Sequence, residues 1–329
     1  MAADVSWKFE LYTLLKNGEL DKAENLVLEK SSDLSSKEDE DFLKTIKFWK
    51  NRSELFCFSE SNGELLLDEW EKFLGFLKEN KIDNKKLINS LKVFIYSKAI
   101  DFLIDAYRIS PIKEKEILFK LGRSFYEIGL VENSLETFEY ISSISSEKDP
   151  RIFLWLGNLY FEVGESDLSM LMYNDAFFYF SQLISLEDIK DPRIKKMADN
   201  IKLDGFQRDD EILEWLPVYC YLYDILTVKR KLEYSDFVEL REKILNYERS
   251  LQANKSLKNV FLPRLINHYI WLIDYYLFQA NAIAPVRSVL ERILELLDGI
   301  EIEEVRKKLK ERTEFLVNNL LKKKESVVN

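Results

Sequence analysis

The sequence predicts an all-α protein, built as a right-handed solenoid of antiparallel helix hairpins. Three observations support this fold class. Apolar residues recur at spacings of three and four along the chain, as they do on one face of a helix. The 329 residues include only 9 Gly and 6 Pro, fewer than the turns of a β-rich protein would need. Proline follows a capping residue at Ser110-Pro111, Asp149-Pro150 and Asp191-Pro192, which is typical of the first turn of a helix.

The same signals place the helices in order along the chain. Glycines at 18, 129 and 164 are expected to turn the chain between paired helices, and Pro285 ends the most apolar segment. Pro217 lies inside a predicted helix and should kink it. The predicted helices cover 5–16, 20–30, 37–58, 64–79, 84–108, 111–128, 131–145, 150–163, 166–186, 192–203, 209–230, 235–252, 258–280, 285–298 and 301–323.

Two stretches repeat at an offset of 35 residues, LGRSFYEIGLVENSLETFEY at 121–140 and LGNLYFEVGESDLSMLMYND at 156–175. The first glycine of each stretch should let the second helix of a hairpin approach closely, and the second glycine should turn the chain. A single hairpin cannot bury both of its faces, so hairpins of this kind stack. The residues that correspond are Leu118 and Phe153, Leu121 and Leu156, Gly122 and Gly157, Phe125 and Tyr160, Gly129 and Gly164, Ser134 and Ser169, and Phe138 and Tyr173.

This pattern resembles the tetratricopeptide repeat, whose period is about 34 residues. Both stretches match the family's Leu-Gly, aromatic, Gly and aromatic positions, with Ser134 and Ser169 in place of its Ala. A weaker match opens the chain at Trp7, Gly18, Ala23 and Val27, and a degenerate one begins at "DPRI" (191–194). The predicted organisation is therefore an N-terminal helical region with a degenerate hairpin (1–110), central repeats (111–205) and a C-terminal helical region (206–329).

The resemblance implies a binding face on the first helix of each hairpin. Proteins of this family usually bind a partner peptide or helix there. One subset clamps chaperone carboxylates with Lys and Asn, but three of those places hold Phe119, Arg123 and Trp155 here, so that clamp is absent. By position, the predicted partner-binding residues are Phe119, Arg123, Tyr126, Arg151, Trp155, Asn158 and Phe161. The alternative is that these aromatic residues fill the core between helices.

Nothing in the sequence indicates catalysis. The one histidine, His268, lies among aromatic residues and is interpreted as a core residue, with a catalytic base as the alternative. Cys57 and Cys220 are expected to be small buried hydrophobes and not a disulfide. With so few soft ligands and no phosphate-binding glycine motif, we predict no metal, no cofactor and no enzyme activity.

The net charge of −10 argues against nucleic acid and anionic lipid as partners. The exception is a lysine- and arginine-rich stretch between 307 and 324, interpreted as a solvated helix face. Segment 258–287 is interrupted by polar residues, so we predict a core helix and no transmembrane segment. No signal peptide is evident, and a cytoplasmic location is expected, or one at the periphery of a membrane-anchored assembly.

These observations predict a protein–protein interaction scaffold or adaptor that binds a protein or peptide partner in a concave groove. The alternative is a repeat protein that binds a small ligand or an export substrate in an apolar tunnel. The preference for Lys, Asn, Ile, Phe and Tyr indicates an AT-rich bacterial genome. The sequence resembles tetratricopeptide scaffolds of the spirochaete flagellar collar, which implies a role in assembling a bacterial motility machine.

Overall fold

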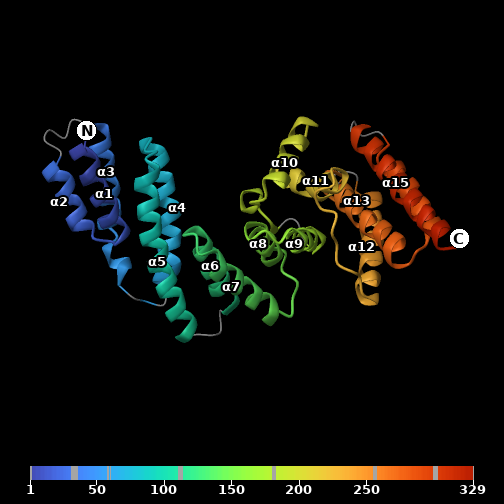
Figure 1. Ribbon diagram of the computed structural model, residues 1–329, viewed down its shortest axis with the longest axis horizontal. Coiled ribbons are helices and arrows are strands. Elements are labelled where there is room, and N and C mark those ends of the chain that lie inside the picture. Colours follow the sequence, from blue (N-terminus) through green and yellow to red (C-terminus); the bar gives the residue numbers. More distant parts are fainter. Residues whose placement is uncertain are drawn as a thin grey trace. The chain divides into compact units, whose positions relative to one another are not determined.

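The computed structural model describes residues 2–30, 36–57, 59, 61–109, 114–179, 183–254, 258–298 and 303–328 (Figure 1). These residues form fifteen α-helices and no β-strand, with a helical content of 82%. The predicted all-α class is confirmed. The predicted cap at Ser110-Pro111 lies outside the described residues.

The chain forms two compact units, unit 1 (Met1–Ser145) and unit 2 (Ser146–Asn329). The solenoid arrangement and the predicted regions with boundaries at 110 and 205 stay predictions. The helices of unit 1 are α1 (Ala2–Lys16), α2 (Leu20–Lys30), α3 (Lys37–Lys50), α4 (Asn62–Asn80), α5 (Lys85–Ile109), α6 (Glu114–Glu127) and α7 (Val131–Ile144). Those of unit 2 are α8 (Pro150–Glu162), α9 (Ser166–Tyr179), α10 (Pro192–Leu203), α11 (Asp209–Leu222), α12 (Tyr234–Ala253), α13 (Lys258–Asp274), α14 (Ile283–Leu296) and α15 (Glu303–Val328).

Packing of aromatic side chains dominates the core of unit 1. The indoles of Trp49 on α3 and Trp70 on α4 stack with ring centroids 6.2 Å apart, and Phe73 lies against both. In the weak first repeat, Ala23 and Val27 are fully buried, as the pattern predicts. The turn between α1 and α2 has Gly18 at φ +73° with the Phe94 ring directly against it, so no side chain could fit there.

The hairpin of α6 and α7 follows the repeat pattern in detail. A Cβ atom on Gly122 would lie 2.7 Å from the Phe138 ring, so the predicted close approach is confirmed. The hydroxyl of Ser134 donates a hydrogen bond of 2.7 Å to the carbonyl oxygen of Gly122 and ties the two helices together. Gly129, at φ +81°, turns the chain between them.

The hairpin of α8 and α9 repeats these contacts 35 residues later. A Cβ atom on Gly157 would lie 3.0 Å from the Tyr173 ring, and the Ser169 hydroxyl donates to the Gly157 carbonyl over 2.8 Å. Gly164 takes φ +85° in the turn. The sequence repeat therefore corresponds to one local structure formed twice, once in each unit.

Two identical caps begin α8 and α10. The Asp149 carboxylate accepts a hydrogen bond from the backbone N–H of Arg151 (3.0 Å), and Asp191 accepts one from Arg193 (2.8 Å). A proline occupies the first turn in both helices. The caps predicted from the Asp-Pro pairs are confirmed.

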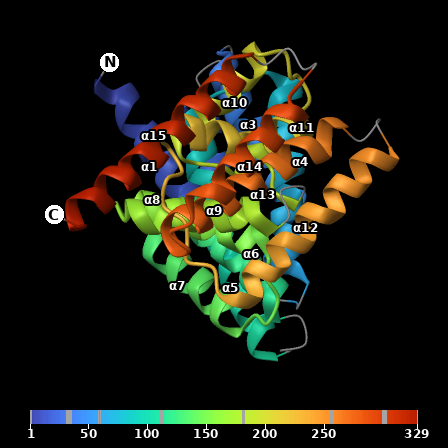
Figure 2. The ribbon, with the colours of Figure 1, turned by 90° about the vertical axis from the view of Figure 1, so that its right-hand side faces the viewer.

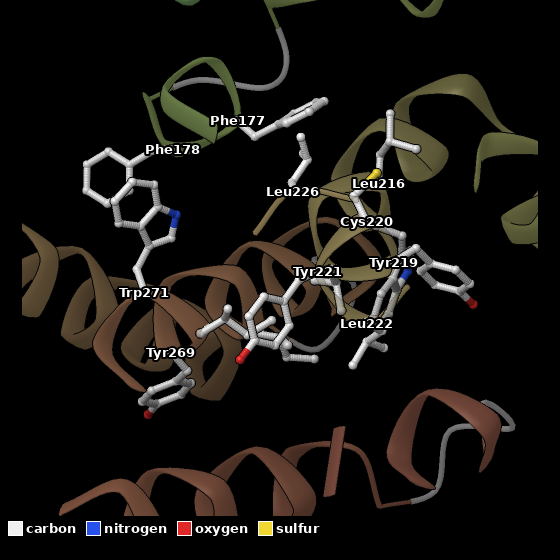
Figure 3. Close-up of a cluster of buried hydrophobic side chains, with 14 of the residues drawn as sticks. Phe177, Phe178, Leu216, Tyr219, Cys220, Tyr221, Leu222, Leu226, Tyr269 and Trp271 are labelled. Atoms are coloured by element: carbon white, nitrogen blue, oxygen red, sulfur yellow. The ribbon is translucent and has the colours of Figure 1, made fainter. Parts of the chain in front are cut away.

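The core of unit 2 centres on α13, which packs against α11, α12 and α14 (Figure 2). Figure 3 shows the buried side chains where α9, α11 and α13 meet, among them Phe178, Cys220 and Trp271. Trp155, Trp215 and Trp271 are all less than 3% exposed. The segment 258–280 is thus a core element, as predicted, although its last residues, Tyr275–Gln279, form a π-helical turn.

Several sequence predictions differ from the structure. The helix predicted over 166–186 ends at Tyr179, and a separate 3₁₀ turn forms at Leu186–Asp188. The helix predicted over 37–58 ends at Lys50 and is followed by a short 3₁₀ turn, Ser53–Phe56, so Cys57 is exposed and its predicted burial is wrong. The helix predicted over 209–230 ends at Leu222, because Asp224 adopts φ +58° and the chain then leaves the helix. Pro217 does lie inside α11, and Cys220 is buried as predicted.

Candidate functional site

The residues predicted to bind a partner come from α6 in unit 1 and α8 in unit 2, and the two sets are described separately. On α6, Arg123 is exposed and Tyr126 is half-buried. Phe119 is 9% exposed and packs edge-on against Phe138 of α7, with ring centroids 5.4 Å apart. Arg123 and Tyr126 therefore lie at the surface of this hairpin, whereas Phe119 lies in its core.

On α8, two of the predicted residues are interior. Trp155 is 1% exposed, and Asn158 is fully buried. The Asn158 carboxamide donates to the Asp188 carbonyl (2.8 Å) and accepts from the Tyr173 hydroxyl (2.5 Å) and the Lys190 N–H (2.9 Å). Asn158 thus fastens the chain that follows α9 onto α8, which is a structural role.

The other two predicted residues of α8 reach solvent in part. Arg151 is half-exposed and its guanidinium contacts the Asp149 carboxylate, with Nη2 2.8 Å from Oδ2. Phe161 is half-buried, and the guanidinium of Arg193 lies 5.5 Å from the centre of its ring. Binding by Arg123, Tyr126, Arg151 and Phe161 stays a prediction, whereas Phe119, Trp155 and Asn158 are buried in the structure.

Unit 2 also contains charged groups that the sequence did not point to. After α11 ends, the chain carries Lys229 and Arg230 into the interior. Lys229 forms an ion pair with Asp274, and its ammonium group lies 4.5 Å from the centre of the Tyr221 ring. Burial lowers the pKa of Lys229, although the charge of Asp274 opposes this shift. Arg230 binds Asp175 (2.9 Å) and Asp236, and burial raises the pKa of Asp175 despite this arginine.

A cavity of about 360 Å³ lies beside these groups. One side of it is the segment Thr227–Leu232, and the other is the end of α13 with the π-helical turn; Trp271, Asp274, Tyr275, Phe278 and Gln279 line it. Asp224 and the β-branched pair Thr227-Val228 have low helix propensity, so they were the sequence signals that could have argued against a helix here. A second cavity, of about 510 Å³, lies between α14 and α15 and is lined by Leu290, Leu294 and Val317, among other residues.

His268 is buried, as predicted, at 3% exposure. Its Nδ1 lies 2.7 Å from the Arg264 carbonyl, so Nδ1 carries the proton and Nε2 does not; Nε2 has no hydrogen-bond partner among the described residues. Burial lowers the pKa of His268 to about 4, helped by the nearby charge of Lys243. The neutral imidazole therefore packs as a core ring between Phe178 and Tyr247.

The described residues offer neither a metal-binding cluster nor a membrane-spanning helix. They contain no group of three or more His, Cys, Asp or Glu side chains placed to hold a metal ion. Within the same ranges, no helix combines the length and the apolar character needed to span a bilayer.

A comparison with protein-family models gave no match, and a comparison with curated proteins gave no significant one. The resemblance to the tetratricopeptide repeat therefore depends on the residues and contacts of this chain alone. The strongest of these are the two glycine–aromatic hairpins.

Proposed function

We propose that the protein is a non-enzymatic adaptor that binds a protein segment through the first helices of its repeated hairpins. The observation that carries this proposal is the hairpin formed twice with the same contacts, Gly122 against Phe138 and Gly157 against Tyr173. In repeat proteins, the first helices of such hairpins present faces on which a partner can bind. The proposed contacts are the solvent-accessible parts of Arg123, Tyr126, Arg151 and Phe161, since Arg and aromatic residues dominate binding energy at interfaces.

The tunnel for a small ligand or export substrate has less support. The aromatic side chains of α11 and α13, which would line it, pack against one another and against α9 (Figure 3). A role in a motility machine, in the cytoplasm or at the edge of a membrane-anchored assembly, is the setting we propose from the sequence resemblance alone.

Crosslinking in the source bacterium tests the proposal. A photoreactive phenylalanine analogue at position 123 or 161 should capture one and the same partner. The analogue at Glu136, an exposed residue of the second helix α7, is the matched control and should not capture it. Capture of one partner equally at all three positions would contradict a specific first-helix face.

The double variant Arg123→Ala, Tyr126→Ala then measures the contribution of this face. We expect it to weaken binding of the captured partner by about 2 kcal/mol or more. The melting temperature should change little, because Arg123 is exposed and Tyr126 is only half-buried. Glu132→Ala with Glu136→Ala, both exposed on α7, should leave affinity unchanged. A large loss of stability with a proportional loss of binding would place both residues in the core and overturn the proposal.

A further inference from the structure

The cavity of about 360 Å³ in unit 2 lies between two walls that are bonded to each other. One wall is the segment Thr227–Leu232, here called the connecting segment, and the other is the end of α13 with the π-helical turn. Lys229 of the first wall forms an ion pair with Asp274 of the second. The Gln279 carboxamide accepts from the N–H of Leu232 and donates to its C=O, each over 3.0 Å. These bonds fix the separation of the walls, so the cavity is already formed before a ligand binds.

The wall at the end of α13 is aromatic. Tyr275 is held by stacking on Phe237 of α12, with ring centroids 4.3 Å apart. Phe278 also lines the cavity and is 58% exposed, so a molecule bound there would remove its ring from water. Cavities of roughly 300 to 1,000 Å³ that are lined by aromatic rings and a few polar groups are typical binding sites for small molecules.

Trp271 provides an unsatisfied hydrogen-bond donor in this wall. The faces of its indole are covered by the Phe178 ring, with centroids 4.8 Å apart, and by the cationic groups of Lys229 and Arg230, 5.5 and 5.9 Å from the ring centre. The N–H lies on an edge of the ring and has no hydrogen-bond partner within the described residues. Figure 3 shows this nitrogen on the side that faces Leu226, the residue before the connecting segment. A ligand that accepts from this N–H would satisfy a buried donor and gain affinity.

The charges beside the cavity cancel. The cationic residues of the connecting segment are Lys229, Arg230 and Lys231. Lys229 is paired with Asp274, and Arg230 binds the carboxylates of Asp175 and Asp236. Three positive charges are therefore matched by three carboxylates, which leaves no net charge for a ligand to pair with. Because a charged molecule would lose its hydration without compensation, the cavity favours an uncharged ligand.

We propose that this cavity binds an uncharged aromatic heterocycle that has a hydrogen-bond acceptor. The ligand ring would lie against Tyr275 and Phe278, and a ring nitrogen or carbonyl oxygen would accept from the Trp271 N–H. The site contains none of the residues of the α6 and α8 faces, so the inference goes beyond the function proposed above and does not depend on it. Nor does it require a tunnel between α11 and α13, because the cavity lies at the end of α13.

The probes are three bicyclic compounds of related shape. Quinoline is uncharged at pH 7.5 and has a ring nitrogen as acceptor, naphthalene has no acceptor, and quinoline-6-carboxylate keeps the nitrogen but adds a charge. The full-length chain is labelled with ¹⁵N-tryptophan, and single Trp→Phe variants assign the indole N–H signals of its 6 tryptophans. Quinoline should move the proton signal of the Trp271 N–H downfield, as a new hydrogen bond does, and naphthalene should not. The carboxylate should bind about tenfold more weakly than quinoline.

The chain offers matched controls for both parts of the site. The buried N–H of Trp215 also lacks a partner among the described residues, but Trp215 does not line the cavity, so its signal should stay in place. Phe278→Ala should weaken quinoline binding by about fivefold. Phe315→Ala, at an exposed phenylalanine of α15, should leave the affinity unchanged. Phe278 and Phe315 are 58% and 63% exposed, so neither substitution should affect folding.

The same titration separates this site from the first-helix face. The Arg123→Ala, Tyr126→Ala variant should bind quinoline as the wild type does, whatever its effect on a protein partner. The proposal is overturned if quinoline leaves the Trp271 signal in place, if it moves the Trp215 signal equally, if the carboxylate binds as tightly as quinoline, or if Phe278→Ala has no effect on affinity.

Discussion

Among the described residues, unit 2 buries carboxylates and unit 1 does not. In the described part of unit 1 the buried polar side chains are the hydroxyls of Thr45, Ser124 and Ser134, each bonded to a backbone carbonyl. Unit 2 buries hydroxyls of this kind at Ser169 and Thr313 too, but it also buries carboxylates and an imidazole; these residues are Asp175, Asp191, Glu211, Glu214 and His268. Packing of apolar side chains suffices for the first core, whereas the second depends on each charge keeping its partner. Stability of unit 2 should accordingly be more sensitive to single substitutions and to pH.

The largest expected effect is that of Arg264→Ala in unit 2. The Arg264 guanidinium contacts both oxygens of Glu214, which is only 5% exposed, with Nε 2.6 Å from Oε2. Removing the arginine leaves a buried carboxylate without its partner and should lower the free energy of unfolding by about 3 to 5 kcal/mol. Urea denaturation of the two proteins measures the difference.

The counterpart in unit 1 is Arg52→Ala. Arg52 pairs with Glu69 (2.5 Å), but the two side chains are 28% and 16% exposed. Water can replace the lost partner, so we expect a loss of about 1 kcal/mol. Equal losses for Arg264→Ala and Arg52→Ala would show that burial of charge does not distinguish the two units.

The pH dependence of unit 2 should include a contribution from His268. Its pKa in the folded chain is about 4, against an ordinary 6.5, so between these values the unfolded chain binds a proton that the folded chain does not. The free energy of unfolding should therefore fall by about 3 kcal/mol as the pH drops through this window, and be unaffected by His268 above it. His268→Phe, which retains a ring between Phe178 and Tyr247, should remove this part of the slope. Denaturation at pH 7 and pH 4.5 provides the test, and parallel pH profiles for the two proteins would contradict it.

One effect on stability should be similar in both units, because both contain the repeated hairpin. Gly122→Ala and Gly157→Ala place a methyl group 2.7 Å from Phe138 and 3.0 Å from Tyr173, rings that are fully buried. Each should cost about 1 to 3 kcal/mol in thermal or urea unfolding. Gly75→Ala, in α4 with nothing near its Cβ position, is the control and should stabilise by up to about 1 kcal/mol. If all three substitutions stabilised the protein, the rings of Phe138 and Tyr173 would not be what requires glycine at positions 122 and 157.

Local sequence signals were enough to place most of the helices. Asp149, Asp191 and the turn glycines act on residues next to them in the chain, so their effects can be recognised without knowing the fold. The end of α11 could not be found this way. The segment Thr227–Leu232 that follows it is held by Asn174 and Gln279, residues about fifty positions away in the chain, and no local pattern reports such contacts.

The candidate site was predicted only in part for a related reason. Alignment of repeats shows which residues share a helix face, and Arg123 and Phe161 do reach solvent. It does not show what covers that face. Asn158 is buried because the chain at Asp188–Lys190 folds back onto it, thirty residues further along.

The tryptophans of the chain are divided evenly between the units, with Trp7, Trp49 and Trp70 in the first and Trp155, Trp215 and Trp271 in the second. Most of these indoles are buried, so their fluorescence should shift to longer wavelength when the surrounding core opens to water. Replacing the indoles of one unit by phenylalanine would leave emission from the other unit alone. Tryptophan fluorescence thus serves as an intrinsic probe for each unit. The unfolding of unit 1, whose core depends on apolar packing, can be recorded separately from that of unit 2, whose core depends on paired charges.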